Sequence, residues 1–184
     1  MSVEPVEPDV TASPFVVLSG DGLVLRCLRQ RDVAALLAGE DDDQVRWLLE
    51  GHRSELERTR RWVGETQGEW ATGGPRRHLG VFDGETGELV GAVEAHLGLG
   101  GGGANVSYVV FPPWRGRRVA VRAVGLLCGW LADATLTRTA VLRIDPRNAP
   151  SRGAARAAGF VLTTRAPEAD DDGERLDRYE RPLR

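Results

Sequence analysis

Two periodicities of apolar residues along the chain predict both helices and strands. Leu56, Val63 and Trp70 recur at intervals of seven, so they would share one face of a helix over residues 54–72. A more continuously apolar stretch predicts a second long helix over residues 119–134. Short runs rich in branched and apolar residues predict strands at 23–28, 78–82, 89–97, 105–111, 138–144, 160–164 and 176–183. Shorter helices are expected at 31–37, 41–49 and 149–158.

The order of these elements predicts an α+β protein. One strand is followed by two or three helices, then by three strands able to pair antiparallel, and then by helix, strand, helix and two strands. This is not the regular alternation that a parallel α/β sheet requires. The 184 residues suit a single domain. Residues 1–20, in which prolines stand among acidic residues, predict a flexible N-terminal tail, so the domain would span 21–184.

Charge and composition narrow the class of function. The net charge of −3 gives no general basic field for nucleic acid. No apolar run is long enough to cross a bilayer, and the acidic, proline-bearing N-terminus is unlike a signal peptide. The two cysteines, Cys27 and Cys128, lie in apolar runs, which favours a reducing, cytoplasmic setting. All 24 basic residues are arginines, so any phosphate contact from a basic side chain must come from arginine.

An arginine-rich loop lies between a predicted strand and a predicted helix. It carries Arg115, Gly116, Arg117 and Arg118, and the helix would begin near Val119. A helix start presents unpaired N–H groups and the positive end of the helix dipole, which together bind anions. Charge alone favours the simpler interpretation, a solvated basic turn.

A second segment follows the next predicted strand. Asn148 can cap a helix, Pro150 suits its first turn, and Gly159 suits its exit before Phe160. Alone, this pattern indicates only the start and the end of an ordinary helix.

Together, the two segments resemble the GNAT superfamily of acyl-CoA-dependent N-acyltransferases, from about residue 23 to the C-terminus. The family's phosphate-loop pattern, Gln/Arg-x-x-Gly-x-Gly/Ala after a Val-x-Pro segment, is matched by Val110-Phe111-Pro112 and by Arg115 to Ala120. Its second signature is matched by Asn148, Ser151, Gly159 and Phe160. The Leu23-x-Leu25-Arg26 strand and the strand containing Gly91 look most like the ribosomal-protein alanine/serine N-acetyltransferase type.

The resemblance implies a mostly antiparallel sheet of about seven strands, splayed at the cofactor site, with helices on both faces. Pantetheine would pair with backbone at the splay, pyrophosphate would sit on the loop amides, and Ser151 would lie near the sulfur of acetyl-CoA. The implied cofactor-binding residues are Val109, Val110, Phe111, Arg115, Gly116, Arg117, Arg118, Val119, Ala120, Asn148 and Ser151. One position departs from the pattern, because Arg118 replaces the central glycine. A non-glycine residue costs roughly 1 kcal/mol or more where the backbone is left-handed.

Acid and base candidates for acyl transfer are few. Ser151 is a candidate to protonate the leaving thiolate, and Glu94 is a candidate base or relay, with His96 on the same strand face. An N–H near Val110 would stabilise the oxyanion. Each side chain also has a plain structural interpretation. The histidines do not show a metal-ligand spacing, so no metal is expected.

The tryptophans and the acidic cluster 41–43 also have both structural and functional interpretations. The tryptophans are expected to be packing residues, and those near the early helices would border an acceptor pocket in this family. The acidic cluster is expected to be solvated, and it would steer a cationic amine if it flanked that pocket.

These observations predict an N-acetyltransferase that moves an acetyl group from acetyl-CoA to a primary amine, on a protein N-terminus or on a small molecule. The alternative is a degenerate acyl-CoA-binding or interaction module with little turnover, which the arginine at 118 and the lack of a clear base suggest. An exposed sheet edge near the last strands would allow two copies to pair as a homodimer.

Overall fold

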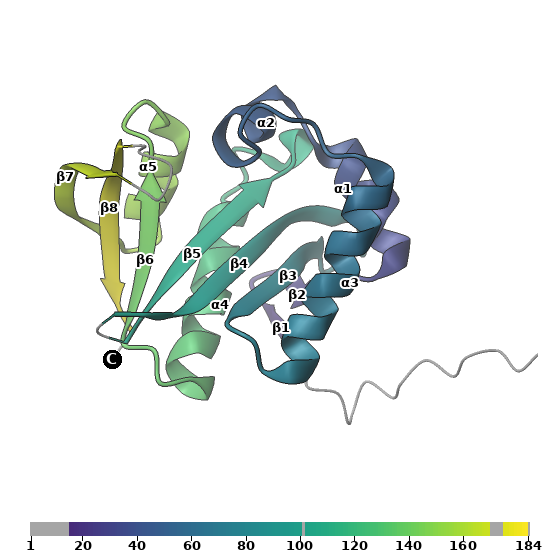
Figure 1. Cartoon of the computed structure of the whole chain (residues 1–184), viewed down its shortest axis with the longest axis horizontal. Coiled ribbons are helices and arrows are strands. Elements are labelled where there is room, and N and C mark those ends of the chain that lie inside the picture. Colours follow the sequence, from purple (N-terminus) through teal and green to yellow (C-terminus); the bar gives the residue numbers. More distant parts are fainter. Residues whose placement is uncertain (1–14, 101, 170–174, 184) are drawn as a thin grey trace, which may run out of the picture.

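The computed structural model describes residues 15–100, 102–169 and 175–183, and its strands form one eight-stranded sheet (Figure 1). The strands are β1 (Val17–Gly20), β2 (Leu23–Arg26), β3 (Arg76–Asp83), β4 (Leu89–Leu99), β5 (Gly103–Val110), β6 (Thr139–Ile144), β7 (Val161–Ala169) and β8 (Arg175–Pro182). The helices are α1 (Val33–Gly39), α2 (Asp42–Leu48), α3 (Leu56–Thr72), α4 (Val119–Ala134) and α5 (Ala149–Ala157), with short 3-10 turns η1 (Gln30–Asp32) and η2 (Pro112–Trp114). The α+β class is therefore confirmed.

The N-terminal boundary needs a correction. β1 lies within residues 1–20, which were expected to be a tail, and it pairs antiparallel with β2. Asp21 and Gly22 form the turn between them with positive φ angles of 51° and 74°. Asp-Gly is a strong hairpin signal because both positions tolerate left-handed backbone. The prediction missed this hairpin, which makes the sheet eight strands wide and not about seven. Residues 1–14 of the expected tail lie outside the described residues.

The strand order is β1-β2-β3-β4-β5-β6-β8-β7. Neighbours pair antiparallel except β5 and β6, which run parallel and pair only from Gly103 to Asn105 against Thr139 to Val141. Beyond Asn105, β5 stays paired with β4 while β6 stays paired with β8, so the two strands diverge (Figure 1). The expected splay is confirmed, and it leaves one edge of β5 without a strand partner.

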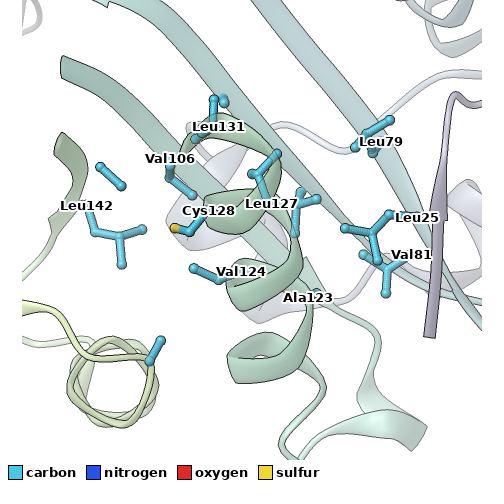
Figure 2. Packing of buried hydrophobic residues seen from close by; sticks show 14 of the residues in the cluster. Leu25, Leu79, Val81, Val106, Ala123, Val124, Leu127, Cys128, Leu131 and Leu142 are labelled. Atoms are coloured by element: carbon cyan, nitrogen blue, oxygen red, sulfur yellow. The ribbon is translucent and has the colours of Figure 1, made fainter. Parts of the chain in front are cut away.

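Helices cover both faces of the sheet, as predicted. α4 packs on one face, and α1 and α3 pack on the other (Figure 1). Val124, Leu127, Cys128 and Leu131 of α4 recur at helical spacing and are buried against β-strand residues such as Val106 (Figure 2). Each fully buried leucine contributes about 1.5–3 kcal/mol to folding. This cluster holds the start of α4 beside the end of β5, where the arginine loop lies.

Candidate active site

The arginine loop lies between β5 and α4, as the sequence predicts. The chain leaves β5, turns through η2 and enters α4 at Val119. The helical backbone hydrogen bonds start with Arg122, whose N–H donates to the Arg118 carbonyl at 3.1 Å. The N–H groups of the first turn before Arg122 therefore have no partner within the helix. With the positive end of the α4 dipole, they make a site suited to an anion.

Arg118 takes the backbone conformation that a glycine would supply. Its φ angle is 60°, and Gly116, two residues earlier, has a φ of 75°. Arg118 is the N-cap of α4, its side chain makes no capping hydrogen bond, and the residue is exposed. The left-handed conformation at this position costs roughly 1 kcal/mol. The loop therefore keeps the glycine-type backbone course although the glycine is missing.

The other two arginine side chains of the loop are engaged. The guanidinium of Arg117 lies 4.9 Å from the ring centroid of Trp114. Arg115 points away from the helix start and pairs with Asp41 at 2.6 and 2.8 Å. The acidic cluster 41–43 is thus not merely solvated, because Asp41 caps α2 and binds this arginine.

The second predicted segment lies across the splay, at the start of α5. Asn148 is the N-cap, and its side-chain oxygen accepts a hydrogen bond from the Ser151 N–H at 3.1 Å. The Ser151 hydroxyl lies 2.8 Å from the hydroxyl of Tyr108. Tyr108 belongs to β5 beyond the part paired with β6. The hydrogen bond therefore connects β5 to the start of α5 across the splay.

Tyr108 is a candidate functional residue that the sequence reasoning missed. In the sequence it alternates with Val106 and Val110, which is the pattern of an ordinary half-buried strand. Burial raises the pKa of Tyr108, against a smaller lowering by the Ser151 hydrogen bond, so the hydroxyl stays protonated at neutral pH. A usable signal was that this chain has only two tyrosines, and one of them stands in the motif strand.

A cavity of about 610 Å³ lies on the other face of the sheet. Its walls come from α1, α2 and α3, from the α2–α3 loop and from β3, β4 and β5. Glu94 lines it from β4, Ser107 lies directly opposite Glu94 on β5, and Trp62 of α3 contributes an aromatic wall. Of the tryptophans near the early helices, Trp62 borders the cavity, whereas Trp70 is buried in the core.

Glu94 is paired with a histidine inside this cavity. The Nδ1 atom of His78 lies 3.3 Å from the Glu94 carboxylate, and the His78 ring packs edge-on against Trp62. Burial, with smaller effects from Arg76 and His96, lowers the pKa of His78 to about 4, so the ring is neutral at pH 7. Burial also raises the pKa of Glu94, with Arg76 opposing it. The contact fits a neutral His78 donating its Nδ1–H to an ionised Glu94.

The two predicted catalytic residues lie on opposite faces of β5. Glu94 and the cavity are on the side of α1 and α3, whereas Ser151 and the Tyr108 hydroxyl are on the side of α4 and α5; part of Tyr108 also lines the cavity. The unpaired edge of β5 runs between them, near Val109 and Val110. A group lying along that edge would meet both sets of side chains.

Some backbone groups at the end of β5 already have hydrogen-bond partners within the protein. The Phe111 N–H donates to the Val90 carbonyl at 2.9 Å, and the Val110 carbonyl accepts from Arg115 Nε at 3.0 Å. Gly91 lies opposite Val110, and a side chain there would collide with the Val109 carbonyl, which explains the glycine. Of the three residues expected to pair with pantetheine, Phe111 therefore has its N–H already occupied.

The described residues hold neither a metal-binding cluster nor a membrane-spanning helix. Among the described residues, no group of three or more histidine, cysteine or acidic side chains is placed to hold a metal ion. In the same part of the chain, no helix combines the length and apolar character needed to cross a bilayer. The buried Cys27 and Cys128 thiols have pKa values raised by burial to about 12 and about 11, so they stay protonated.

Comparisons with known proteins agree with this geometry. Residues 22–161 match the family model described as an acetyltransferase (GNAT) domain. No curated protein matches the sequence.

Three solved structures share the fold at low sequence identity. A candidate ribosomal-protein-serine acetyltransferase from Vibrio cholerae has a TM-score of 0.79 at 16% identity, over 92% of this chain and 99% of that one. The ribosomal L7/L12 alpha-N-protein acetyltransferase RimL, in complex with coenzyme A, has a TM-score of 0.77 at 18% identity, over 91% and 98% of the two chains. A ribosomal-protein-S5-alanine acetyltransferase from Vibrio fischeri has a TM-score of 0.75 at 17% identity, over 91% and 97%. The chain belongs to the GNAT acetyltransferase family, and it is an enzyme that uses acetyl-CoA as its acetyl donor.

Proposed function

We propose that the acceptor of this acetyltransferase is a primary amine that enters the cavity of Glu94 and reacts at the free edge of β5. One observation carries the proposal: that edge has a half-buried carboxylate on one face and a half-buried tyrosine–serine pair on the other. Acyl transfer to an amine needs a group that accepts the amine's proton and a group that supplies a proton to the departing thiolate. The structure offers a candidate for each, on the two sides of the edge.

The described residues fit acetyl-CoA. The left-handed backbone at Gly116 and Arg118 turns the chain into α4, and the amides of the first turn lack helical partners. We assign the pyrophosphate to the amides of Gly116 to Ala120, and the pantetheine to the unpaired edge of β5 beside Val109 and Val110, with Asn148 on the opposite side of the splay. Bound acetyl-CoA supplies the thioester acetyl group. The Val110 N–H would donate to the carbonyl oxygen as that oxygen gains negative charge.

Glu94 would accept the proton of the amine. A raised pKa brings a carboxylate closer to the operating pH, which favours proton transfer from an ammonium group. The neutral His78 would act through Glu94, because its Nδ1–H fixes the carboxylate while its own lowered pKa keeps it from competing as a cation. The negative carboxylate would also attract a cationic acceptor.

Tyr108 and Ser151 would serve the leaving group. Burial raises the pKa of Tyr108, so its hydroxyl is protonated at neutral pH and can donate a proton. Its hydroxyl and that of Ser151 are close enough to pass a proton between them, at 2.8 Å. Either one could protonate the thiolate directly, with the other replacing the lost proton or hydrogen bond.

The acceptor class follows from the neighbours' names together with the cavity. Two of the structures that share this fold are named for acetylating ribosomal proteins at serine or alanine, and RimL is named an alpha-N-protein acetyltransferase. We therefore assign this protein to the ribosomal-protein N-acetyltransferase type, with a protein N-terminus as the acceptor. A small-molecule amine is the second candidate, since the cavity of about 610 Å³ would hold one entirely.

A binding measurement and a turnover measurement test the proposal in sequence. Calorimetry with acetyl-CoA is expected to show binding, and a free-thiol assay is expected to show turnover with peptides that begin with serine or alanine. The same peptides with blocked N-termini are the matched control and should give no thiol. Absence of binding at millimolar acetyl-CoA would contradict the assignment of the loop. Tight binding without turnover over a broad amine panel would support the degenerate module instead.

A further inference from the structure

Arg115 is the most completely bonded arginine of the phosphate loop. Its guanidinium donates to both oxygens of Asp41, at 2.6 and 2.8 Å, and to Asp43 at 3.3 Å. Its Nε–H donates to the Val110 carbonyl at 3.0 Å. A guanidinium has five N–H donors in a rigid planar arrangement. In the paired contact with Asp41, one N–H from each Nη atom donates to a different carboxylate oxygen. These contacts use four of the five donors, so Arg115 could turn its paired N–H groups to a phosphate only by breaking the contact with Asp41.

The partner, Asp41, is at the same time the cap of α2. Its side chain accepts a hydrogen bond from the Gln44 N–H at 3.0 Å, so one carboxylate both begins the helix and binds the arginine. The Arg115 hydrogen bond lowers the pKa of Asp41, and the Asp41 hydrogen bond raises the pKa of Arg115. Both groups therefore stay charged at neutral pH. The side chains are 37% and 26% exposed, so solvent screens part of their attraction.

α2 is a wall of the acceptor cavity. Gln44 and Leu48 of α2 line it, and the Gln44 side-chain oxygen is buried without a hydrogen-bond partner in the described part of the chain. α2 also contacts the loop before α5, because the Arg147 guanidinium lies 6.0 Å from the Trp47 ring centroid. The helix thus lies at the open end of the splay, near the end of β5 and near α5 (Figure 1).

The junction before α2 is also packed against the end of β5. Gly39, the last residue of α1, lies so close to the Phe111 ring that any side chain there would collide with it. Phe111 is itself 4% exposed. Packing at Gly39 and the ion pair at Asp41 thus flank the α1–α2 connection and join it to the segment that leads into the phosphate loop.

We propose that Arg115 is a positioning residue for the acceptor site: it holds α2 over the cavity of Glu94, while the loop amides bind the pyrophosphate. This inference rests on the proposed function, and it changes the role expected for Arg115 from its place in the phosphate-loop pattern. The first residue of the loop joins the cofactor side of β5 to the acceptor side. Loss of the ion pair then weakens acceptor binding and leaves acetyl-CoA binding nearly intact.

Asp41→Asn is the sharpest test, because asparagine keeps an oxygen that can cap α2 but loses the charge and the second acceptor. The acceptor KM is expected to rise about fivefold to tenfold, since hydrogen bonds between charged groups are strong but this pair is partly exposed. The calorimetric Kd for acetyl-CoA should stay within about twofold of wild type. Asp42→Asn is the matched control, because it removes the same charge from the same turn of α2. The Asp42 side chain is 95% exposed and pairs with Arg53, not with Arg115.

Arg115 variants complete a double-mutant cycle. Arg115→Ala should raise the acceptor KM as Asp41→Asn does, and the double variant should be no worse than Arg115→Ala alone, because both changes remove one interaction. Arg115→Lys should recover part of the loss, since it keeps the charge but not the paired geometry. The inference is overturned if Arg115→Ala weakens acetyl-CoA binding by tenfold or more while Asp41→Asn leaves the acceptor KM unchanged.

Hydrogen exchange separates this inference from the proposed function. If wild type shows no turnover with any amine, the proposed function fails, but the amides of α2 can still be followed. Faster exchange of residues 42–48 in Arg115→Ala and Asp41→Asn, and not in Asp42→Asn, would support the positioning role. Equal exchange in all four proteins would reject it.

Discussion

The two faces of β5 are built by different means. On the side of α4, the proposed phosphate loop offers mainly backbone: amides without helical partners, two left-handed residues and a helix dipole. On the side of α1 and α3, the proposed acceptor cavity offers side chains from three strands, three helices and the α2–α3 loop. A backbone site depends on a short local pattern, so it leaves a motif. A side-chain site depends on which elements meet, so its residues are scattered along the sequence. Changes on the acceptor side should therefore alter turnover or acceptor binding, and changes in the loop should alter cofactor binding and stability.

Glu94→Gln should have the largest effect. Glutamine keeps the size and the contact with His78 but cannot accept a proton, so kcat should fall by about 100-fold or more. The Kd for acetyl-CoA, measured by calorimetry, should not change, because Glu94 lies on the opposite face from the phosphate loop. Glu85→Gln in the exposed β3–β4 turn is the control. Retention of kcat within threefold in Glu94→Gln would remove Glu94 from the chemistry.

Tyr108→Phe should have the next largest effect and tests the other face. The change removes one hydroxyl from the half-buried pair with Ser151, so kcat should fall about 10-fold to 100-fold with little change in the acceptor KM. Ser151→Ala should cost less if Tyr108 is the direct donor, and more if Ser151 is. Initial rates of thiol release give both values. A large rise in acceptor KM in Tyr108→Phe would mean that the two faces are not separate.

The buried histidine predicts a pH dependence of stability. Because folding lowers the pKa of His78 from 6.5 to about 4, the unfolded chain binds the proton more tightly than the folded one. The free energy of unfolding should therefore receive the full contribution of His78 above pH 6.5 and lose it as the pH falls toward 4. One such group gives a slope of up to about 1.4 kcal/mol per pH unit. Urea unfolding of wild type and His78→Gln from pH 7.5 to 4 measures it. Parallel curves for the two proteins would show that His78 is not the group responsible.

Arg118→Gly should have the smallest effect and concerns the loop alone. It removes a left-handed non-glycine residue, which relieves roughly 1 kcal/mol, but it also gives the unfolded chain more freedom. The net gain should be between about zero and 1 kcal/mol, or up to about 4 °C in Tm. Gly116→Ala introduces the strain that Arg118→Gly removes, and it should lower Tm. Acetyl-CoA binding should be unchanged or slightly tighter in Arg118→Gly. A loss of affinity would mean that the Arg118 side chain contacts the cofactor.

The strand–loop–helix segment that leads into α4, and the helix α5, could be predicted from sequence because their signals are local. Helix α4 has the bounds expected from its apolar run, Asn148 caps α5, and β5 and β6 diverge as the resemblance implies. The Asp21-Gly22 hairpin was equally local and was overlooked among prolines and acidic residues. The acceptor side was only partly readable. Its residue type and strand position single out Glu94, whereas no sequence pattern pairs it with His78, which lies opposite it on the neighbouring strand β3.

The sequence alone determines the course of the backbone at the proposed cofactor site. A strand, a glycine-bearing turn and a helix start depend only on residues that are neighbours in the chain. What the tertiary structure decides is which side chains face each other. Tyr108 and Ser151 are 43 residues apart, and Arg115 and Asp41 are 74 residues apart. Neither pair has a fixed spacing that a sequence pattern could carry, because sheet order and helix packing bring them together. For the same reason, the motif alone would assign Arg115 to the cofactor. In the fold its side chain binds Asp41 at the start of α2, which borders the proposed acceptor cavity.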